Sequence, residues 1–379
     1  MSIKFGFWSE QETQVGQSYA RRLLELVDEA VFAEKMGFDL VALSEQHLAL
    51  GGISSSAPEV VYGHLAAKTS RIKLRPSVVL MPKNFNHALR TAERAAVTDI
   101  LSHGRFELYC GRANTTIAMR GFNVDPSETQ EQMEEGMDLI REAFTNDVFT
   151  FKGKHYQVPP RMLVPKPLQK PYPTMGVAAT SERSHVWAGQ QGLAVMSHSL
   201  YKGWEVQDKL IKAYKSSWQR DPKGPSEKAR IGMPLFIGIG NTDQEAYDTY
   251  AGPLKHYARI STSGYPKLAQ LSKDYAYMAE GAEALQRAAG DWDYLINESA
   301  SLVCGSPETV IRQLERYVDL GIDEILFHLD SVPHSEIMKA IDLIGRYVIP
   351  YFKDRNNVVR DYDDVLEQIR AMREPTIPA

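Results

Sequence analysis

Residues 37–45, GFDLVALSE, join the end of one predicted helix to a short apolar strand. Before Gly37, apolar residues from Leu23 to Val31 recur at helical spacing, and glycine is common just after the end of a helix. The run that follows Gly37 is short and continuously apolar, which is typical of a strand buried on both faces. A helix that leads directly into a buried strand indicates a parallel sheet flanked by helices.

The same unit repeats on both sides of this stretch. Strands are predicted to begin near residues 3, 38, 72 and 105, at intervals of roughly 33 to 35 residues, which is the size of a βαβ unit. Further apolar runs near residues 174, 193, 233 and 324 bring the number of strands to eight. Eight strand–helix units predict a closed α/β fold, a (β/α)8 TIM barrel with insertions.

Several segments lie outside this repeat. We expect residues 1–353 to form a single barrel domain with an insertion at about 241–303, whose extra helices cover one barrel mouth. A charged amphipathic helix over residues 127–144 and a hairpin over residues 148–158 decorate the repeat. Residues 354–379 are predicted to be a charged C-terminal extension.

Composition excludes several classes of protein. The chain has 43 Lys and Arg against 48 Asp and Glu, so no strong basic field exists to attract nucleic acid. The two cysteines, Cys110 and Cys304, form neither a disulfide framework nor a zinc pattern, which suits a reducing compartment. The first residues lack a signal-peptide pattern, and no run of about 18 apolar residues occurs. We therefore expect a cytoplasmic protein without a nucleic-acid or membrane partner.

Metal and nicotinamide sites have little support in the sequence. None of the ten histidines forms a His-x-His or His-Glu-x-x-His pattern, so no metal site is expected. The stretch GIGNTD, residues 238–243, lacks the third glycine of the dinucleotide fingerprint and its downstream acid. The favoured interpretation is a strand–turn–helix junction capped by Asn241 or Thr242.

An anion site has better support. The stretch ATSERSH, residues 179–185, stands between an apolar strand and a helix, so Ser181 and Ser184 would place hydroxyls beside unpaired helix N–H groups. An ordinary helix cap is the alternative. Arg112 follows the neighbouring strand, where its guanidinium would reach the same anion in a bidentate manner or form a surface ion pair.

Three long blocks resemble the bacterial luciferase-like flavin-dependent monooxygenases. They are GRFELYCGRANTTIAMRGFNVDPSE (104–128), KGKHYQVPPRMLVPKPLQKPYPTMGVAATSERS (152–184) and CGSPETVIRQLERYVDLGIDEILFHLD (304–330). The likeness covers nearly the whole chain, and it implies a (β/α)8 barrel, which agrees with the repeat count.

The resemblance also implies a cofactor and a reaction. Reduced FMN would lie across the barrel mouth and react with O2 to give a flavin C4a-(hydro)peroxide, which oxygenates a small organic substrate. Without a convincing nicotinamide motif, the reduced FMN should come from a separate flavin reductase. The Ser77–Val78 peptide matches a non-proline cis bond of the family under the flavin ring. The cofactor-binding residues expected in this way are Ser77, Val78, Arg112, Asn114, Thr180, Ser181 and Ser184.

His47 is the first catalytic candidate, because an imidazole near the flavin edge can exchange protons close to neutral pH. The alternative to a catalytic role is a structural one, with His47 packed beneath the loop at residues 51–52. Luciferases carry two adjacent histidines here, the first being catalytic, whereas this chain has Gln46 at that position. Gln46 is no base at neutral pH but can hydrogen-bond flavin or substrate.

The substrate pocket is expected to include Trp8, His198 and His328, each of which has a purely structural role as its alternative. Tyrosines of the insertion are predicted to contribute an aromatic wall: Tyr250, Tyr257, Tyr265, Tyr275 and Tyr277.

Two other functions remain open at this point. One is a deazaflavin-dependent hydride-transfer oxidoreductase built on the same barrel. The other is a non-catalytic flavin-binding barrel, which the complete eight-unit repeat and the long insertion argue against. We expect a homodimer or a dimer of dimers.

Overall fold

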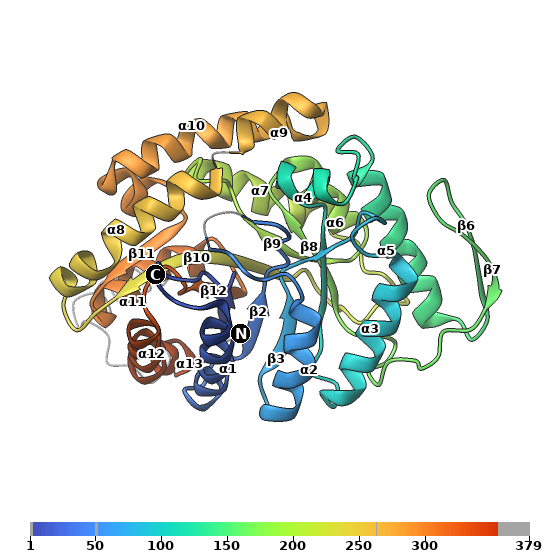
Figure 1. Cartoon of the computed structure of the whole chain (residues 1–379), viewed down its shortest axis with the longest axis horizontal. Coiled ribbons are helices and arrows are strands. Elements are labelled where there is room, and N and C mark those ends of the chain that lie inside the picture. Colours follow the sequence, from blue (N-terminus) through green and yellow to red (C-terminus); the bar gives the residue numbers. More distant parts are fainter. Residues whose placement is uncertain (1–2, 50–51, 263, 355–379) are drawn as a thin grey trace, which may run out of the picture.

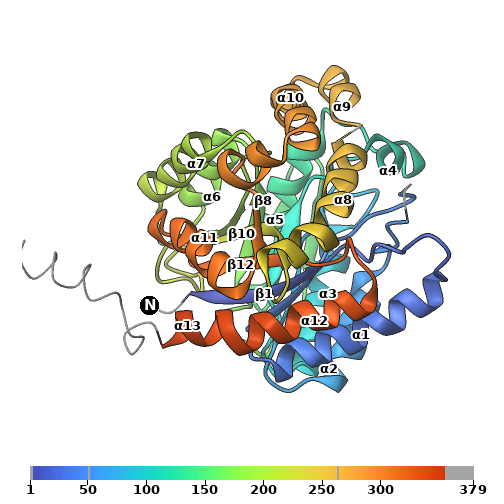
Figure 2. The same cartoon turned by 90° about the vertical axis from the view of Figure 1, so that its left-hand side faces the viewer.

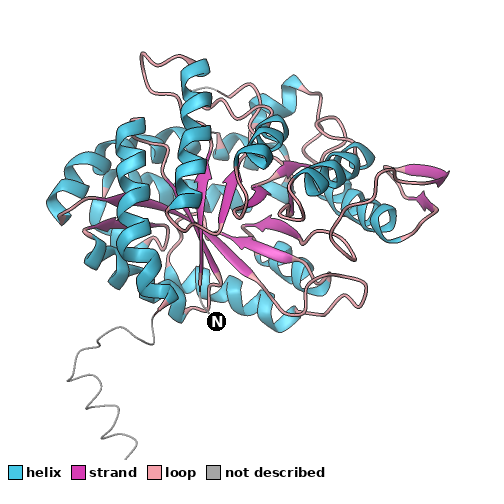
Figure 3. Cartoon of the chain, turned by 90° about the horizontal axis from the view of Figure 1, so that it is seen from below, coloured by secondary structure: helices cyan, strands magenta, loops and turns pink. Residues whose placement is uncertain are grey.

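The computed structural model describes residues 3–49, 52–262 and 264–354. Its centre is a parallel barrel, seen from below in Figure 3 as strands surrounded by helices. The sheet order is β3-β2-β1-β12-β10-β9-β8-β5-β4, and a bridge between Leu74 and Phe106 brings the two ends of the sheet together. This confirms the predicted barrel. The barrel strands are β1 (Lys4–Ser9), β2 (Leu40–Leu43), β3 (Lys73–Pro76), β4 (Val79–Leu80), β5 (Leu108–Gly111), β8 (Met175–Ala179), β9 (Ala194–Ser197), β10 (Ile231–Ile239) and β12 (Glu324–His328).

Helices cover the outside of the barrel, and α12 packs beside α1 as Figure 2 shows. Their ends follow the expected signals. Ser306 caps α11 by accepting a hydrogen bond from the Thr309 amide, and Gly321 follows the helix at φ +80°. The helices of this outer layer are α1 (Tyr19–Lys35), α2 (Pro58–Lys68), α3 (Ala88–Leu101), α5 (Thr129–Thr145), α6 (Glu182–Gln190), α7 (Trp204–Ser217), α11 (Pro307–Asp319), α12 (His334–Leu343), the π-helical η3 (Ile344–Val348) and α13 (Ile349–Lys353).

The barrel interior is packed with side chains. One buried cluster within it contains Leu40, Ala42, Tyr109, Ala194 and Leu326, all less than 1% exposed. The Tyr109 ring lies directly over β8, so a Cβ at Gly176 would come within 2.5 Å of it. The absence of a side chain at that position therefore gives the tyrosine its room.

Four charged side chains fill the N-terminal end of the interior. The Arg75 Nη2 lies 2.6 Å from Glu107 Oε2 and 2.7 Å from Glu324 Oε2. Arg230 contacts the same two carboxylates, 3.0 Å from Glu107 Oε1 and 2.7 Å from Glu324 Oε1. Burial opposes ionisation of Glu107, but the two guanidiniums hold its pKa well below the usual value. These contacts connect β3, β10, β12 and the start of β5 across the barrel axis.

The insertion lies over the opposite end of the barrel, where α9 and α10 form the top of Figure 1. Thr242 caps its first helix by accepting a hydrogen bond from the Glu245 amide at 3.1 Å, as the sequence suggested for GIGNTD. The insertion contains α8 (Asp243–Thr262), α9 (Tyr265–Leu271), η1 (Lys273–Tyr275), α10 (Tyr277–Gly290) and the π-helical η2 (Tyr294–Glu298).

Two further elements decorate the barrel. The predicted hairpin is formed by β6 (Phe149–Lys152) and β7 (Gln157–Arg161), and α4 (Thr116–Gly121) follows β5. The sequence did not predict strand β11 (Leu302–Gly305), which pairs with residues 236–239 at the end of β10. It was missed because it begins within the segment that the sequence assigned to the insertion, outside the strand–helix repeat.

The predicted C-terminal extension, apart from Asp354, lies outside the described residues. Among the helices that are described, none is both long and apolar enough to cross a membrane.

The interior charge cluster generates the first prediction. Replacing Arg75 with Met leaves two buried carboxylates with one guanidinium, so we expect the free energy of unfolding to fall by about 3–5 kcal/mol. Urea denaturation at neutral pH measures this loss. The matched control is Arg90→Met, which removes an exposed pair with Glu93 on α3 and should change stability by less than about 1 kcal/mol. Equal stabilities of the two variants would contradict the role given to Arg75.

Candidate functional site

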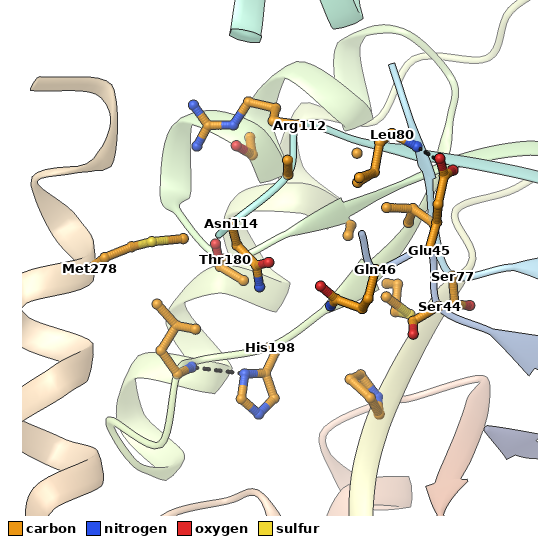
Figure 4. A pocket seen from close by; sticks show the side chains of 18 of the residues that line it. Ser44, Glu45, Gln46, Ser77, Leu80, Arg112, Asn114, Thr180, His198 and Met278 are labelled. Carbon is orange, nitrogen blue, oxygen red and sulfur yellow. Dashed lines mark hydrogen bonds between the residues drawn. The ribbon is translucent and has the colours of Figure 1, made fainter. Parts of the chain in front are cut away.

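A cavity of about 210 Å³ opens at the C-terminal ends of the barrel strands, beneath the insertion. Figure 4 shows side chains from several strands converging on it. Four of the five predicted insertion tyrosines line it, whereas the Tyr250 hydroxyl donates to the Glu336 carbonyl elsewhere. The predicted site residues that line the cavity are Trp8, Gln46, Ser77, Val78, Arg112, Asn114, Thr180, Ser184 and His198. His47, Ser181 and His328 are not part of its lining.

The peptide between Ser77 and Val78 is cis, as the sequence resemblance implied. It separates β3 from β4, and both of its residues line the cavity. Gly111 on the neighbouring strand approaches Val78 so closely that a Cβ would lie 2.3 Å from Val78 Cγ2. A side chain at 111 would therefore force Val78 and this wall of the cavity to shift.

One corner of the cavity gathers polar groups from the ends of β5 and β8. Ser181 caps α6, and its Oγ lies 3.0 Å from the Ser184 Oγ. Thr180 donates a hydrogen bond of 2.9 Å to the Tyr277 hydroxyl, and Arg112 donates one of 3.1 Å to the same oxygen. The structure thus brings these predicted residues together, and Tyr277, which the sequence placed in an aromatic wall, joins them through its hydroxyl.

The insertion packs against this polar corner. The Arg112 guanidinium lies 4.4 Å from the centre of the Tyr275 ring, and it is 3.5 Å from the Asp274 carbonyl. The Asp274 carboxylate in turn lies 3.6 Å from Arg183 Nη1. A guanidinium, several hydroxyls and the start of α6 form a donor set that suits a phosphate.

His47 lies behind the cavity wall. Its Nε2 is 2.8 Å from Glu45 Oε1, and its ring stacks on Phe85 with centroids 5.5 Å apart. Phe122 contacts another side of the ring at 4.8 Å. Glu45 lines the cavity and also accepts the Leu80 amide, the hydrogen bond drawn at the upper right of Figure 4. Glu45 thus connects the cavity to His47.

His198 and His328 are both neutral at pH 7, because burial lowers the pKa of each to about 4. His198 lines the cavity, and its Nδ1 accepts the Leu200 amide. His328 lies deeper, with its ring 4.9 Å from both Trp8 and Phe236. Its two nitrogens have no hydrogen-bond partner among the described residues.

Glu10 is a cavity residue to which the sequence assigned no role. Its Oε2 accepts a short hydrogen bond from Tyr257, and the Gln46 Nε2 lies 3.4 Å from its Oε1. Burial, and then the negative charge of Asp330, raises the pKa of Glu10 to about 7. Its position after the first strand was visible in the sequence, but its burial depends on α8, far along the chain.

Glu12 and His328 lie close to Glu10. One side-chain nitrogen or oxygen atom from each of the three residues lies within 4.8 Å of the others. Burial raises the pKa of Glu12 as well, so both carboxyl groups hold their protons more tightly than an exposed carboxyl group does. The sequence expectation of no metal site rested on consecutive His patterns, and it stays a prediction.

The family model described as "Luciferase-like monooxygenase" matches residues 3–324 of the chain. Among curated proteins, the chain is 24% identical over 368 residues to the oxygenase component of a flavin-dependent trigonelline monooxygenase from Acinetobacter baylyi, covering 93% of this chain and 96% of that protein. It is 26% identical over 310 residues to an F420-dependent glucose-6-phosphate dehydrogenase from Amycolatopsis mediterranei, covering 80% and 88% of the two chains.

A solved structure agrees in fold. The oxygenating constituent of 3,6-diketocamphane monooxygenase from Pseudomonas putida, in complex with FMN, has a TM-score of 0.71 and 16% sequence identity, covering 92% of this chain and 99% of that one.

The close approach of Gly111 to Val78 gives the second prediction. In Gly111→Ala, the new methyl overlaps Val78, so we expect a loss of about 1–3 kcal/mol in the free energy of unfolding, measured by urea denaturation. The control is Gly63→Ala in α2, where a Cβ meets nothing within 4 Å and should stabilise by about 0.5–1 kcal/mol. If both variants were stabilised, the cavity wall would not depend on this contact.

Proposed function

The chain belongs to the luciferase-like monooxygenase family, and from this premise we propose that it is the oxygenase component of a two-component, FMN-dependent monooxygenase. The observation that carries the proposal is the polar corner of the cavity. There Arg112, Thr180 and Ser184 stand together beside the start of α6. Such a corner suits the phosphate of FMN.

The cofactor would be held by residues that line the cavity and by Ser181, which caps α6 beside them. Arg112, Ser181 and Ser184 would bind the phosphate, and the wall formed by Ser77 and Val78 would support the ring. When bound, reduced FMN would supply two electrons that activate O2, so that one oxygen atom of O2 enters the substrate and the other leaves as water.

The rest of the cavity would shield the reaction from water and orient the substrate. Trp8 and Phe236 present rings 6.4 Å apart, and the insertion tyrosines close the space above them. Gln46 offers an amide to flavin or substrate. His47, linked to the cavity through Glu45, would exchange protons with groups at the cavity wall.

A separate reductase would supply the reduced flavin in the cytoplasm. One support is the relative named as an oxygenase component. The other is the GIGNTD segment, where Thr242 caps α8 and the glycine-rich turn of a nicotinamide-binding fingerprint is missing, so the electrons would come from another protein. The substrate is a small organic molecule.

A second candidate is a deazaflavin-dependent oxidoreductase. The F420-dependent relative favours it, and F420 also carries a phosphate that the same corner would accept. The two candidates differ in the cofactor that the protein prefers.

Arg112→Ala tests the phosphate site. Loss of a bidentate charged contact should weaken the binding of reduced FMN by about 2 kcal/mol, roughly thirtyfold, in anaerobic equilibrium titrations. Arg120→Ala is the control, because Arg120 is exposed on α4 and does not line the cavity. An unchanged affinity in a folded Arg112→Ala variant would reject the phosphate role.

Competition between the two cofactors tests the proposed function itself. We expect reduced FMN to bind at least tenfold more tightly than reduced F420, measured by anaerobic fluorescence titration of each. Tight binding of reduced F420 with no binding of reduced FMN would establish the second candidate instead.

A further inference from the structure

The deep side of the cavity is aromatic. Phe236 is the centre of this group, with its ring 5.9 Å from Tyr201 in a stacked arrangement and 5.0 Å from Tyr257. Trp8 and Tyr265 line the same cavity. Such walls favour a flat aromatic molecule, which gains contact area and ring–ring interactions there.

Glu10 is the carboxyl group on this aromatic side. Glu45 also lines the cavity, but its oxygens already accept hydrogen bonds from His47 and the Leu80 amide. The Glu10 carboxyl is held by Tyr257 on one oxygen and by the longer 3.4 Å contact of Gln46 on the other. Its second oxygen therefore retains capacity for a hydrogen bond with a ligand.

The surroundings of Glu10 raise its pKa, so that its carboxyl group holds a proton up to near-neutral pH. The Asp330 carboxylate accepts the Glu10 amide at 2.5 Å, and Arg22 divides its charge between Asp330 and Glu29. Burial and Asp330 together raise the pKa of Glu10 to about 7, where a carboxyl is suited to both donating and accepting a proton. The titratable groups around Glu10 are Glu12, Arg22, Tyr201, Tyr257, Tyr265, His328 and Asp330.

We infer that Glu10 binds and deprotonates the substrate, which is an aromatic compound with an acidic O–H or N–H group, and that Tyr257 positions the carboxylate. The substrate class rests on the proposed function. The proton moves from the substrate oxygen or nitrogen to a Glu10 oxygen, and the electron pair of the broken bond stays on the substrate. The ring thereby becomes richer in electrons and more reactive toward an electrophilic oxygen atom.

Infrared titration of the flavin-free full-length protein tests the carboxyl itself. The infrared difference spectrum between wild type and Glu10→Gln should contain the carbonyl band of a protonated carboxyl group. This band should disappear as the pH rises, with a midpoint near pH 7. Tyr257→Phe should raise this midpoint by roughly one pH unit, because the tyrosine hydrogen bond favours the ionised form. Tyr201→Phe removes a hydroxyl from the same cavity without touching that bond, and it should leave the midpoint in place. A midpoint below about pH 5 in wild type would overturn the inference.

Ligand binding tests the substrate class. At about pH 8.5, where Glu10 is ionised, wild type should bind phenol at least tenfold more tightly than anisole, which lacks the hydroxyl hydrogen. Calorimetry should show that Glu10→Gln reduces this preference about fivefold or more, because a neutral acceptor replaces a charged one, whereas Tyr201→Phe keeps it.

Equal binding of the two probes by wild type, binding of neither, or an unchanged preference in Glu10→Gln would each contradict the inference. These measurements need no flavin. If the preference for phenol held but reduced FMN failed to bind, the proposed function would fail while the role of Glu10 stood.

Discussion

The buried charge cluster of Arg75, Glu107, Arg230 and Glu324 is the constraint on which the barrel depends. Its members come from strands on different sides of the axis, and each carboxylate is shared by two guanidiniums. A barrel whose N-terminal end is filled by ion pairs, and whose middle is filled by apolar side chains, has room for a ligand only at its C-terminal end. The cavity lies there.

At that end, the protein places two chemically different surfaces side by side. The ends of β5 and β8 supply a polar corner that suits a phosphate, with Arg112 and Thr180 joined through Tyr277. The ends of β1, β9 and β10 supply an aromatic surface with one buried carboxyl group at Glu10. The insertion contributes to both surfaces, so cofactor and substrate would share one covering element.

The sequence predicted the barrel because its signals are local: each helix stop and each apolar run lies within one repeat. It also predicted the polar corner, since strand ends in a barrel converge on one edge. Contacts between segments far apart in the chain could not be predicted from the sequence. The position of His47 between Phe85 and Phe122, the bridging hydroxyl of Tyr277 and the raised pKa of Glu10 all depend on side chains more than thirty residues away. Strand β11 was missed because it begins within the segment assigned to the insertion, where no strand–helix repeat pointed to it.

The most direct test of the proposed monooxygenase activity is the reaction of protein-bound reduced FMN with O2, followed by rapid-mixing absorbance spectroscopy. Saturating protein should change the course of reoxidation, so that a transient absorbing species precedes oxidised FMN and outlives its counterpart in free solution. Reoxidation at the same rate and without a transient species, at protein concentrations well above that of the flavin, would contradict a flavin monooxygenase.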